Sequence, residues 1–326
     1  MYRFLERLSD PRPILLDGAT GTELNRRGVD TALPLWSAGA LLNAPDVLRQ
    51  IHADYLAAGA EVITANTFRT HRRSLAHASL SHRARELTHL AVQIAREAAA
   101  LHTPRSTLHV SRVTPRPLIA GSLAPLEDCY SPELVPPQEE CEREHAEMAR
   151  DLAKAGVDLI LIETMNTVRE AQAAARAARD TGLPFVVSFV CRTDGRLFSG
   201  ESVAEAARSL ERFGPAMLGI NCTPVPTIHE PLAELRASTR LPILGYANVG
   251  RTDHIQGWTN TGDVSPEQYA ERARTWLALG LRLVGGCCGT TPAHIQALCA
   301  NLPWEDSAVQ NDPGAQAALA HLLEDP

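Results

Sequence analysis

Residues 281–291, LRLVGGCCGTT, lead from a short apolar run into a glycine-rich turn that contains two adjacent cysteines. The run from Leu281 to Val284 has the length of a buried strand, and Pro292 to Ala300 predicts a helix, so the stretch forms one strand–turn–helix unit. Adjacent residues of a regular strand point to opposite faces. The two thiols therefore reach one site only if the backbone bends, and we expect the flanking glycines to permit that bend.

The cysteine pair alone leaves three interpretations open. Cys287 and Cys288 could be two ligands of a zinc site whose third ligand lies elsewhere, a small buried pair, or a strained vicinal disulfide. The chain contains 7 cysteines, an odd number spread unevenly, which suits a reducing compartment better than a disulfide framework. Thiols that stay reduced are available as metal ligands.

The same alternation of an apolar run and a helical segment continues outward through the chain. Strands are predicted at Pro13–Asp17, Glu61–Phe68, Leu118–Gly121, Asp158–Glu163, Phe185–Val190, Met217–Cys222, Ile243–Ala247 and Leu281–Val284. Helices are predicted at Ala44–Gly59, Glu86–Leu101, Gln138–Ala155, Pro231–Ser238 and Pro292–Ala300, and after capping-box sequences that begin at Thr167, Ser202 and Ser265. Apolar strands joined by helices are typical of a parallel sheet covered on both faces. These eight units predict an α/β fold, a (β/α)8 TIM barrel.

The barrel is expected to form a single domain over residues 1–303. Two segments have a different character. The Pro/Arg-rich stretch 103–116 predicts an exposed loop. Residues 304–326 predict a polar C-terminal tail, in which Ala315 to Leu323 could form a short helix.

The composition and net charge of the chain indicate which kinds of molecule it binds. Of 326 residues, 44% are apolar and 21% are charged, as in ordinary globular proteins, and the net charge is −7. Scattered basic residues in an acidic chain argue against a nucleic-acid surface, so we expect small-molecule partners. No apolar run reaches the length of a membrane span, and the first residues lack the apolar core of a secretion signal. We therefore expect no membrane contact and a cytoplasmic location.

Polar residues follow the predicted strands at the end where barrel enzymes carry their active sites. They are Asp17, Asn66, Thr67, Ser122, Glu163, Thr164, Asn221, Cys222, Asn248, Cys287 and Cys288. Strands six and eight are alternate strands, whose inward side chains share a layer, so Cys222 can meet Cys287 and Cys288. Three thiolates without a fourth protein ligand describe an open, catalytic type of zinc site.

Three segments together resemble a known family. DGATGTEL (17–24), GINC (219–222) and GGCCGT (285–290) are similar to the signature segments of the homocysteine S-methyltransferase family. Betaine–homocysteine methyltransferase and the homocysteine-binding domain of cobalamin-dependent methionine synthase also represent that family. The resemblance runs from about residue 12 to residue 302 and keeps the order and spacing of a whole domain.

The resemblance implies roles for individual residues. Cys222, Cys287 and Cys288 would bind Zn²⁺, and the sulfur of homocysteine would take the open position. Asp17 and Glu163 would hold the substrate ammonium group. Backbone N–H groups of Gly18, Ala19 and Thr20 are candidates for the carboxylate. Asn66, Asn221 and Asn248 lie at the same predicted mouth and are candidate substrate ligands, although polar packing explains them nearly as well.

The chemistry agrees with such a site. A free thiol has a pKa of about 8.5 and is mostly protonated at neutral pH, whereas a zinc-bound thiol is deprotonated. The predicted function is zinc-dependent methyl transfer to homocysteine, which forms methionine. The predicted donor is S-methylmethionine or S-adenosylmethionine, since the chain shows neither cobalamin nor folate modules and no aromatic cage for betaine.

Several alternatives remain open. A separate corrinoid protein or a folate system could supply the methyl group, and selenocysteine or another thiol could accept it. A non-catalytic barrel that binds zinc or thiols is a hypothesis from another class. A homo-oligomer is compatible with the sequence.

Overall fold

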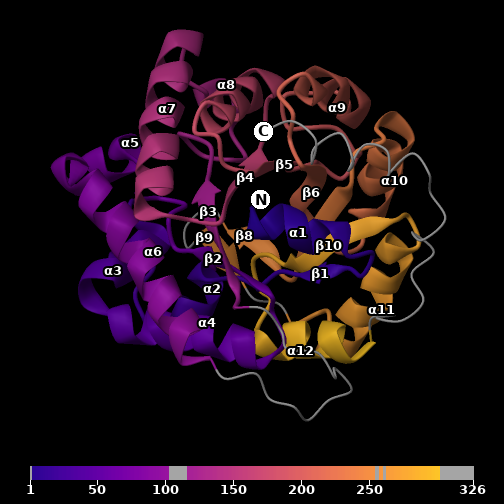
Figure 1. The fold of residues 1–326 in the computed structure, drawn as a ribbon, viewed down its shortest axis with the longest axis horizontal. Helices are drawn as coiled ribbons and strands as arrows, with labels where there is room; N and C mark the ends of the chain where they lie inside the picture. Colours follow the sequence, from indigo (N-terminus) through magenta and orange to yellow (C-terminus); the bar gives the residue numbers. More distant parts are fainter. Residues whose placement is uncertain (1, 103–115, 254–256, 260–261, 302–326) are drawn as a thin grey trace.

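Eight parallel strands close into a barrel at the centre of the protein (Figure 1). The computed structural model describes residues 2–102, 116–253, 257–259 and 262–301. The strands are β1 (Ile14–Leu15), β2 (Val62–Ala65), β3 (Leu118–Leu123), β4 (Leu159–Met165), β5 (Phe185–Phe189), β6 (Met217–Pro224), β7 (Ile243–Asn248) and β10 (Leu281–Gly286). Their order is β1-β10-β7-β6-β5-β4-β3-β2, and a parallel bridge between Leu16 and Val62 joins β1 to β2. The predicted (β/α)8 barrel is confirmed.

Helices surround the barrel, and each helix of this ring follows a strand in the chain (Figure 1). The ring consists of α4 (Pro45–Ala57), α6 (Ala84–Leu101), α7 (Gln138–Ala155), α8 (Val168–Arg179), α9 (Val203–Glu211), α10 (His229–Ser238), α11 (Pro266–Leu277) and α12 (Pro292–Asn301). Shorter elements are α1 (Arg3–Ser9), α2 (Gly21–Arg26), α3 (Ala40–Asn43), α5 (Arg72–Ala76) and the 3-10 turns η1 (Trp36–Gly39), η2 (Ser81–Arg83) and η3 (Pro132–Leu134). After β7, strands β8 (Arg251–Asp253) and β9 (Gly257–Thr259) form an antiparallel hairpin.

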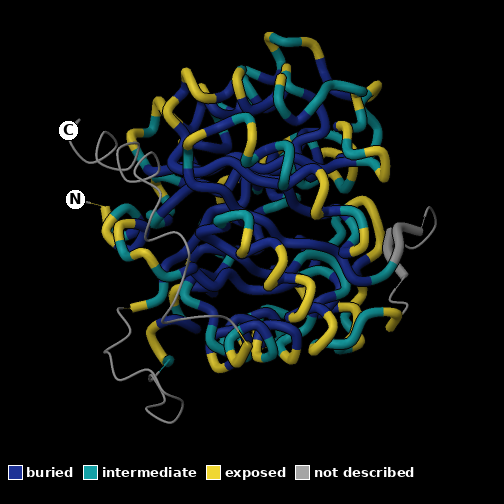
Figure 2. The backbone as a smooth tube through the Cα atoms, turned by 90° about the vertical axis from the view of Figure 1, so that its right-hand side faces the viewer, coloured by how far each residue is buried: buried dark blue, intermediate teal, exposed yellow. Residues whose placement is uncertain are grey.

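Alternation along the strands produces two apolar cores. Figure 2 shows that buried residues occupy the centre of the molecule. The inner core fills the barrel with Ile14, Leu16, Val62, Leu118, Leu159, Leu161, Val186, Met217, Leu244 and Leu283. The outer core lies between strands and helices and includes Leu15, Ile63 and Ile160.

Helix α1 closes the barrel at the end where the strands begin. Its Phe4 and Leu8 are fully buried and belong to the inner core. Arg282, at the start of β10, donates a hydrogen bond to the carbonyl of Leu8 over 2.9 Å. Because this end is plugged, the open mouth of the barrel is at the carboxyl ends of the strands.

The helix starts confirm two of the three predicted capping boxes. Ser202 and Ser265 each exchange both capping hydrogen bonds with the residue three positions on. The third prediction is wrong in part: Thr167 accepts the amide of Glu170, but the Glu170 carboxylate accepts the amide of Leu126 over 2.8 Å. Glu170 is fully buried, so its carboxylate serves a contact between segments and not the helix end.

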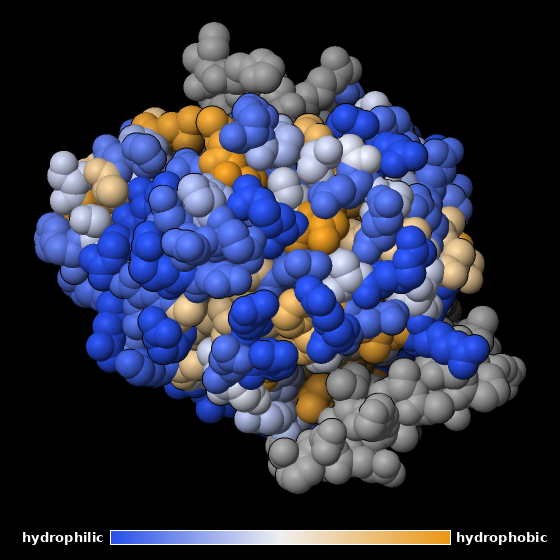
Figure 3. Space-filling view, turned by 90° about the horizontal axis from the view of Figure 1, so that it is seen from above, coloured by the Kyte–Doolittle hydropathy of each residue, from blue (hydrophilic) through white to orange (hydrophobic). Residues whose placement is uncertain are grey.

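The face shown in Figure 3 carries mainly hydrophilic residues, with hydrophobic ones in small separate patches. Among the described helices, none combines the length and the apolar character that crossing a bilayer requires. The predicted tail, 304–326, and the predicted loop 103–116 up to residue 115 lie outside the described residues.

Candidate metal centre and substrate site

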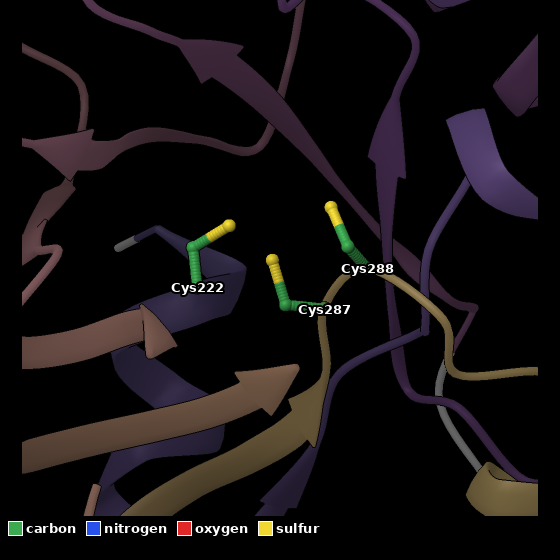
Figure 4. Close-up of side chains that lie close together, drawn as sticks. All are labelled: Cys222, Cys287 and Cys288. Atoms are coloured by element: carbon green, nitrogen blue, oxygen red, sulfur yellow. The ribbon is translucent and has the colours of Figure 1, made fainter. Parts of the chain in front are cut away.

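Three cysteines meet at the mouth of the barrel. Cys222 lies near the end of β6, and Cys287 and Cys288 directly follow β10. Their sulfur atoms all lie within 4.8 Å of one another and face a common space (Figure 4). Among the described residues, no other group of three or more potential metal ligands is this close together. The structure thus brings together the three residues that the sequence predicted.

The backbone of Cys222 leaves strand geometry. Asn221 points into the barrel, where its Oδ1 accepts a hydrogen bond from the hydroxyl of Ser188 over 2.7 Å. The next residue of a regular strand would face the helices. Cys222 instead has a φ of 54°, an uncommon conformation for a residue with a side chain, and its sulfur turns to the mouth. This turn lets residues from two strands share one site.

The structure corrects the predicted role of Gly285 and Gly286. Both lie within β10, and neither has a positive φ. They permit close packing: a Cβ on Gly285 would lie 2.7 Å from Cβ of Leu16, and one on Gly286 would lie 2.3 Å from Oγ1 of Thr290. The chain bends after the strand, where Gly289 has a φ of 82° and Thr290 N–H donates to the carbonyl of Cys287.

Thr290 connects this turn to the segment after β1. Its hydroxyl donates to the carbonyl of Cys287 over 2.7 Å and accepts the amide of Ala19 over 3.2 Å. Tyr55 donates to the carbonyl of Ala19 over 2.8 Å. Of the amides predicted to bind a carboxylate, that of Ala19 therefore already has a partner, while the roles of Gly18 and Thr20 stay predictions.

The cluster fits a thiolate-bound metal. Zinc–sulfur bonds of about 2.3 Å in a tetrahedral site place sulfurs roughly 3.8 Å apart, which small side-chain rotations can reach from the observed spacing. Hydrogen bonds from Cys287 and Cys288 lower the pKa of the Cys222 thiol, whereas these contacts to Cys222 raise the pKa of the other two. The first effect favours the charged form of Cys222, and a bound cation would compensate that charge.

Two buried carboxyl groups lie at the same mouth. Asp17 is 1% exposed and accepts the amide and the hydroxyl of Thr64 over 2.7 and 2.9 Å. Glu163 accepts a short hydrogen bond from Ser122 and one from Tyr246 over 3.0 Å. Burial raises the pKa of each carboxyl to about 7, and the charge of Glu163 adds to the effect on Asp17.

No described residue gives these carboxyl groups a cationic partner. Within the described residues, neither Asp17 nor Glu163 forms an ion pair. Two buried acids of this kind are costly when ionised unless a positive group joins them. The arrangement therefore suits a ligand that carries an ammonium group.

The predicted asparagines have structural contacts of different kinds. Asn66 donates to the carbonyl of Ser37 over 2.8 Å, and Asn221 holds Thr164 through both its amide oxygen and its amide nitrogen. Asn248 donates to the carbonyl of Cys222 over 2.7 Å. Its buried Oδ1 has no hydrogen-bond partner among the described residues, so Asn248 retains an acceptor for a ligand.

Sequence reasoning missed two tyrosines of the site. Tyr246 lies two residues after Leu244 in β7, so the inward alternation of the strand would have found it. Tyr130 lies in the connection after β3, and its hydroxyl is 3.2 Å from the sulfur of Cys222. No periodic signal marks a residue in such a connection.

Parallel barrels with helices outside carry their active sites at the carboxyl ends of the strands, and the thiols and buried acids lie there. The fold and site thus define the class, a (β/α)8-barrel enzyme. The chain belongs to the homocysteine S-methyltransferase family, a family of methyltransferases, because the family model described as homocysteine S-methyltransferase matches residues 14–302.

Individual relatives agree with the family assignment. The chain is 34% identical to homocysteine S-methyltransferase YbgG of Bacillus subtilis, over 91% of this chain and 96% of the relative. It is 33% identical to a selenocysteine methyltransferase of Astragalus bisulcatus, over 88% of this chain and 91% of the relative. Among solved structures, the metallated form of the homocysteine methyltransferase MmuM from Escherichia coli has a TM-score of 0.77 and 30% identity, covering 91% of this chain and 98% of that chain.

Proposed function

We propose that the protein transfers a methyl group to the sulfur of homocysteine, with Zn²⁺ held by Cys222, Cys287 and Cys288. The observation that carries the proposal is the cluster of three sulfurs, within 4.8 Å of one another, at the mouth of a barrel of this family. A bound zinc ion would keep the substrate thiol deprotonated at neutral pH. Through such an ion, the three cysteines would hold the acceptor sulfur at the mouth of the barrel.

Asp17 and Glu163 bind the ammonium group of the amino acid in this proposal. An ammonium ion favours the ionised form of each carboxyl and so lowers the pKa that burial has raised. Hydrogen bonds from Thr64 to Asp17 and from Tyr246 to Glu163 keep both carboxylates oriented when the ligand binds. The free oxygen of Asn248 is a further polar contact for the ligand.

A sulfonium compound, S-methylmethionine or S-adenosylmethionine, is the proposed donor. The thiolate sulfur forms a bond to the methyl carbon while the bond from that carbon to the sulfonium breaks, and its electron pair stays on the departing thioether. Tyr130 and Phe198 pack edge to face, with ring centroids 5.4 Å apart, beside Cys222. Two aromatic rings thus lie near the predicted metal ligands, and aromatic rings attract cations such as a sulfonium.

Selenocysteine is a second candidate acceptor. The relative from Astragalus bisulcatus, 33% identical to this chain, is named a selenocysteine methyltransferase. A selenol would occupy the same position as the thiol. Competition between the two acceptors at equal concentration would rank them by their relative kcat/KM.

The test supplies metal-replete protein with homocysteine and each donor in turn and measures methionine by mass spectrometry. A corrinoid methyl donor and a folate methyl donor are separate arms of the test. Zinc binding without methionine in any arm would favour a non-catalytic thiol-binding barrel. A variant with Cys222 and Cys287 both replaced by Ala controls for uncatalysed transfer.

We further propose a cytoplasmic location, because Cys222, Cys287 and Cys288 lie close together without forming a disulfide and reducing compartments keep such thiols reduced. A homo-oligomer is also part of the proposal, and its size can be measured by light scattering.

A further inference from the structure

The connection between β3 and α7 brings a tyrosine to the metal centre from outside the three family segments. The hydroxyl oxygen of Tyr130 lies 3.2 Å from the sulfur of Cys222, within hydrogen-bond distance for a sulfur atom. Its ring packs against Phe198, which lies between β5 and α9, at an interplanar angle of 65°. Cys222 is 5% exposed and Tyr130 is half-buried, so this contact is partly shielded from water.

Several hydrogen bonds fix this connection in place. The amide of Tyr130 donates to the carboxylate of Asp128 over 3.0 Å, which holds the turn itself. Upstream, the amide of Leu126 donates to the fully buried Glu170 over 2.8 Å. The same Glu170 oxygen lies 3.1 Å from Nε2 of the buried His145 in α7. The phenol is therefore held at Cys222 by the protein before any ligand binds.

The direction of the hydrogen bond follows from the chemistry of the two groups. A cysteine bound to a metal is a thiolate, which has no proton to donate and can only accept. A phenol has one proton to donate. Tyr130 is therefore the donor and Cys222 the acceptor whenever a metal is bound.

We propose that Tyr130 is a positioning residue of the metal centre, whose phenol donates a hydrogen bond to the Cys222 thiolate. The bond holds this sulfur toward Cys287 and Cys288, and it draws electron density from Cys222 so that this ligand donates less to the metal. The inference rests on the proposed function, because it takes the three cysteines as metal ligands. Partners of metal ligands often change metal affinity or activity by about 10- to 100-fold.

Cobalt(II) replaces zinc in the test, because thiolate-to-cobalt charge transfer reports the electron density of the ligand sulfurs. The Tyr130→Phe variant removes the hydroxyl and keeps the ring against Phe198. We expect its charge-transfer band to move to lower energy, because a sulfur without the hydrogen bond gives up an electron more easily. We also expect about a 10-fold loss of zinc affinity in a competition with a chromophoric chelator, because loss of the bond that holds the sulfur toward Cys287 and Cys288 outweighs the stronger donation by Cys222.

Two control variants separate the hydrogen bond from packing. Tyr2→Phe makes the same chemical change at an exposed residue and should leave band and affinity unchanged. Phe198→Leu removes the ring partner but keeps the phenol, so its band should stay at the parent position. A Phe198→Leu protein that reproduces the Tyr130→Phe shift would overturn the proposal.

The remaining outcomes are also decisive. A Tyr130→Phe protein that folds with an unshifted band, or that does not fold at all, overturns the proposal and makes Tyr130 a structural residue. A parent protein that binds cobalt without thiolate bands would instead contradict the proposed metal site. The two failures are therefore distinguishable in one experiment.

Discussion

The hydroxyl of Tyr246 donates a hydrogen bond to Oε2 of Glu163 over 3.0 Å, across the inside of the barrel from β7 to β4. Ser122 on β3 donates to the other oxygen of the same carboxyl group. Both oxygens are thus held by neutral donors, and no described cation balances the charge of Glu163. A carboxylate whose two oxygens are both held by hydrogen bonds can bind a cationic ligand without moving.

Replacing Glu163 by Gln should weaken homocysteine binding and leave the metal in place. Hydrogen bonds to charged groups contribute about 1.5–3 kcal/mol, so we expect about a 10- to 100-fold higher Kd. Titration calorimetry on zinc-loaded protein measures the affinity, and metal analysis measures the zinc. Glu133→Gln, at an exposed glutamate, is the control. Unchanged homocysteine affinity would make Glu163 a structural residue of the mouth.

The metal site itself predicts about one zinc per chain. Cys287→Ala should lose most of this zinc, since two thiolates hold a tetrahedral ion far less tightly than three. Cys191→Ala, at a buried cysteine outside the cluster, should retain it. Atomic absorption on both purified variants is sufficient, and full zinc occupancy in Cys287→Ala would refute the assignment of the ligands.

The strands were predictable because each is an apolar run with a helix after it, as in Leu159–Met165 followed by α8. The places of Cys222 and Cys287 at the ends of alternate barrel strands predicted that they lie close together, although the positive φ of Cys222 is what turns its sulfur to the mouth. Helix α1 was not predicted, because its role depends on Phe4 and Leu8 filling a barrel end that only the closed sheet creates.

Local backbone geometry also limited what could be predicted from the sequence. The glycines beside the cysteines suggested a bend, and Gly289 has the expected positive φ, whereas Gly285 and Gly286 do not and a second positive φ falls on Cys222. Sequence preference places glycine at such positions, so a cysteine there gives no signal. Tyr130 was missed for a related reason, since hydrogen bonds from a connection such as residues 124–131 follow no period.

Titration of Asp17 and Glu163 should appear in the stability of the metal-free, ligand-free protein. Each carboxyl has a pKa of about 7 when folded and about 4 when unfolded, so the folded state binds more protons between these values. Their contribution to the free energy of unfolding is therefore full below about pH 4 and is lost as the pH rises through about 7.

A double variant, Asp17→Asn with Glu163→Gln, isolates this effect. Other groups titrate in the same range: His52, whose pKa burial lowers to about 4, adds stability as the pH rises. That contribution is common to both proteins and cancels in the difference. Urea unfolding at pH values from about 4.5 to 8 covers most of the range in which these carboxyls titrate in the folded and unfolded states. Over this range, the parent should lose stability relative to the variant as the pH rises. Parallel curves would show that the two carboxyls are already ionised in the folded protein.

Adding one methyl group at Gly286 should damage the metal centre through Thr290. A Cβ at Gly286 would lie 2.3 Å from Oγ1 of Thr290, so that side chain must move and lose its bonds to Ala19 and Cys287. Overpacking of this kind costs about 1–3 kcal/mol, so we expect a loss of this size in the free energy of unfolding measured in urea, together with weaker zinc binding.

Gly39→Ala is the matched control. The new Cβ meets nothing closer than 3.8 Å, and the backbone there is helical, so stability should stay equal or rise. If Gly286→Ala kept both the stability and the zinc affinity of the parent, Thr290 would not be the link that positions the cysteine turn.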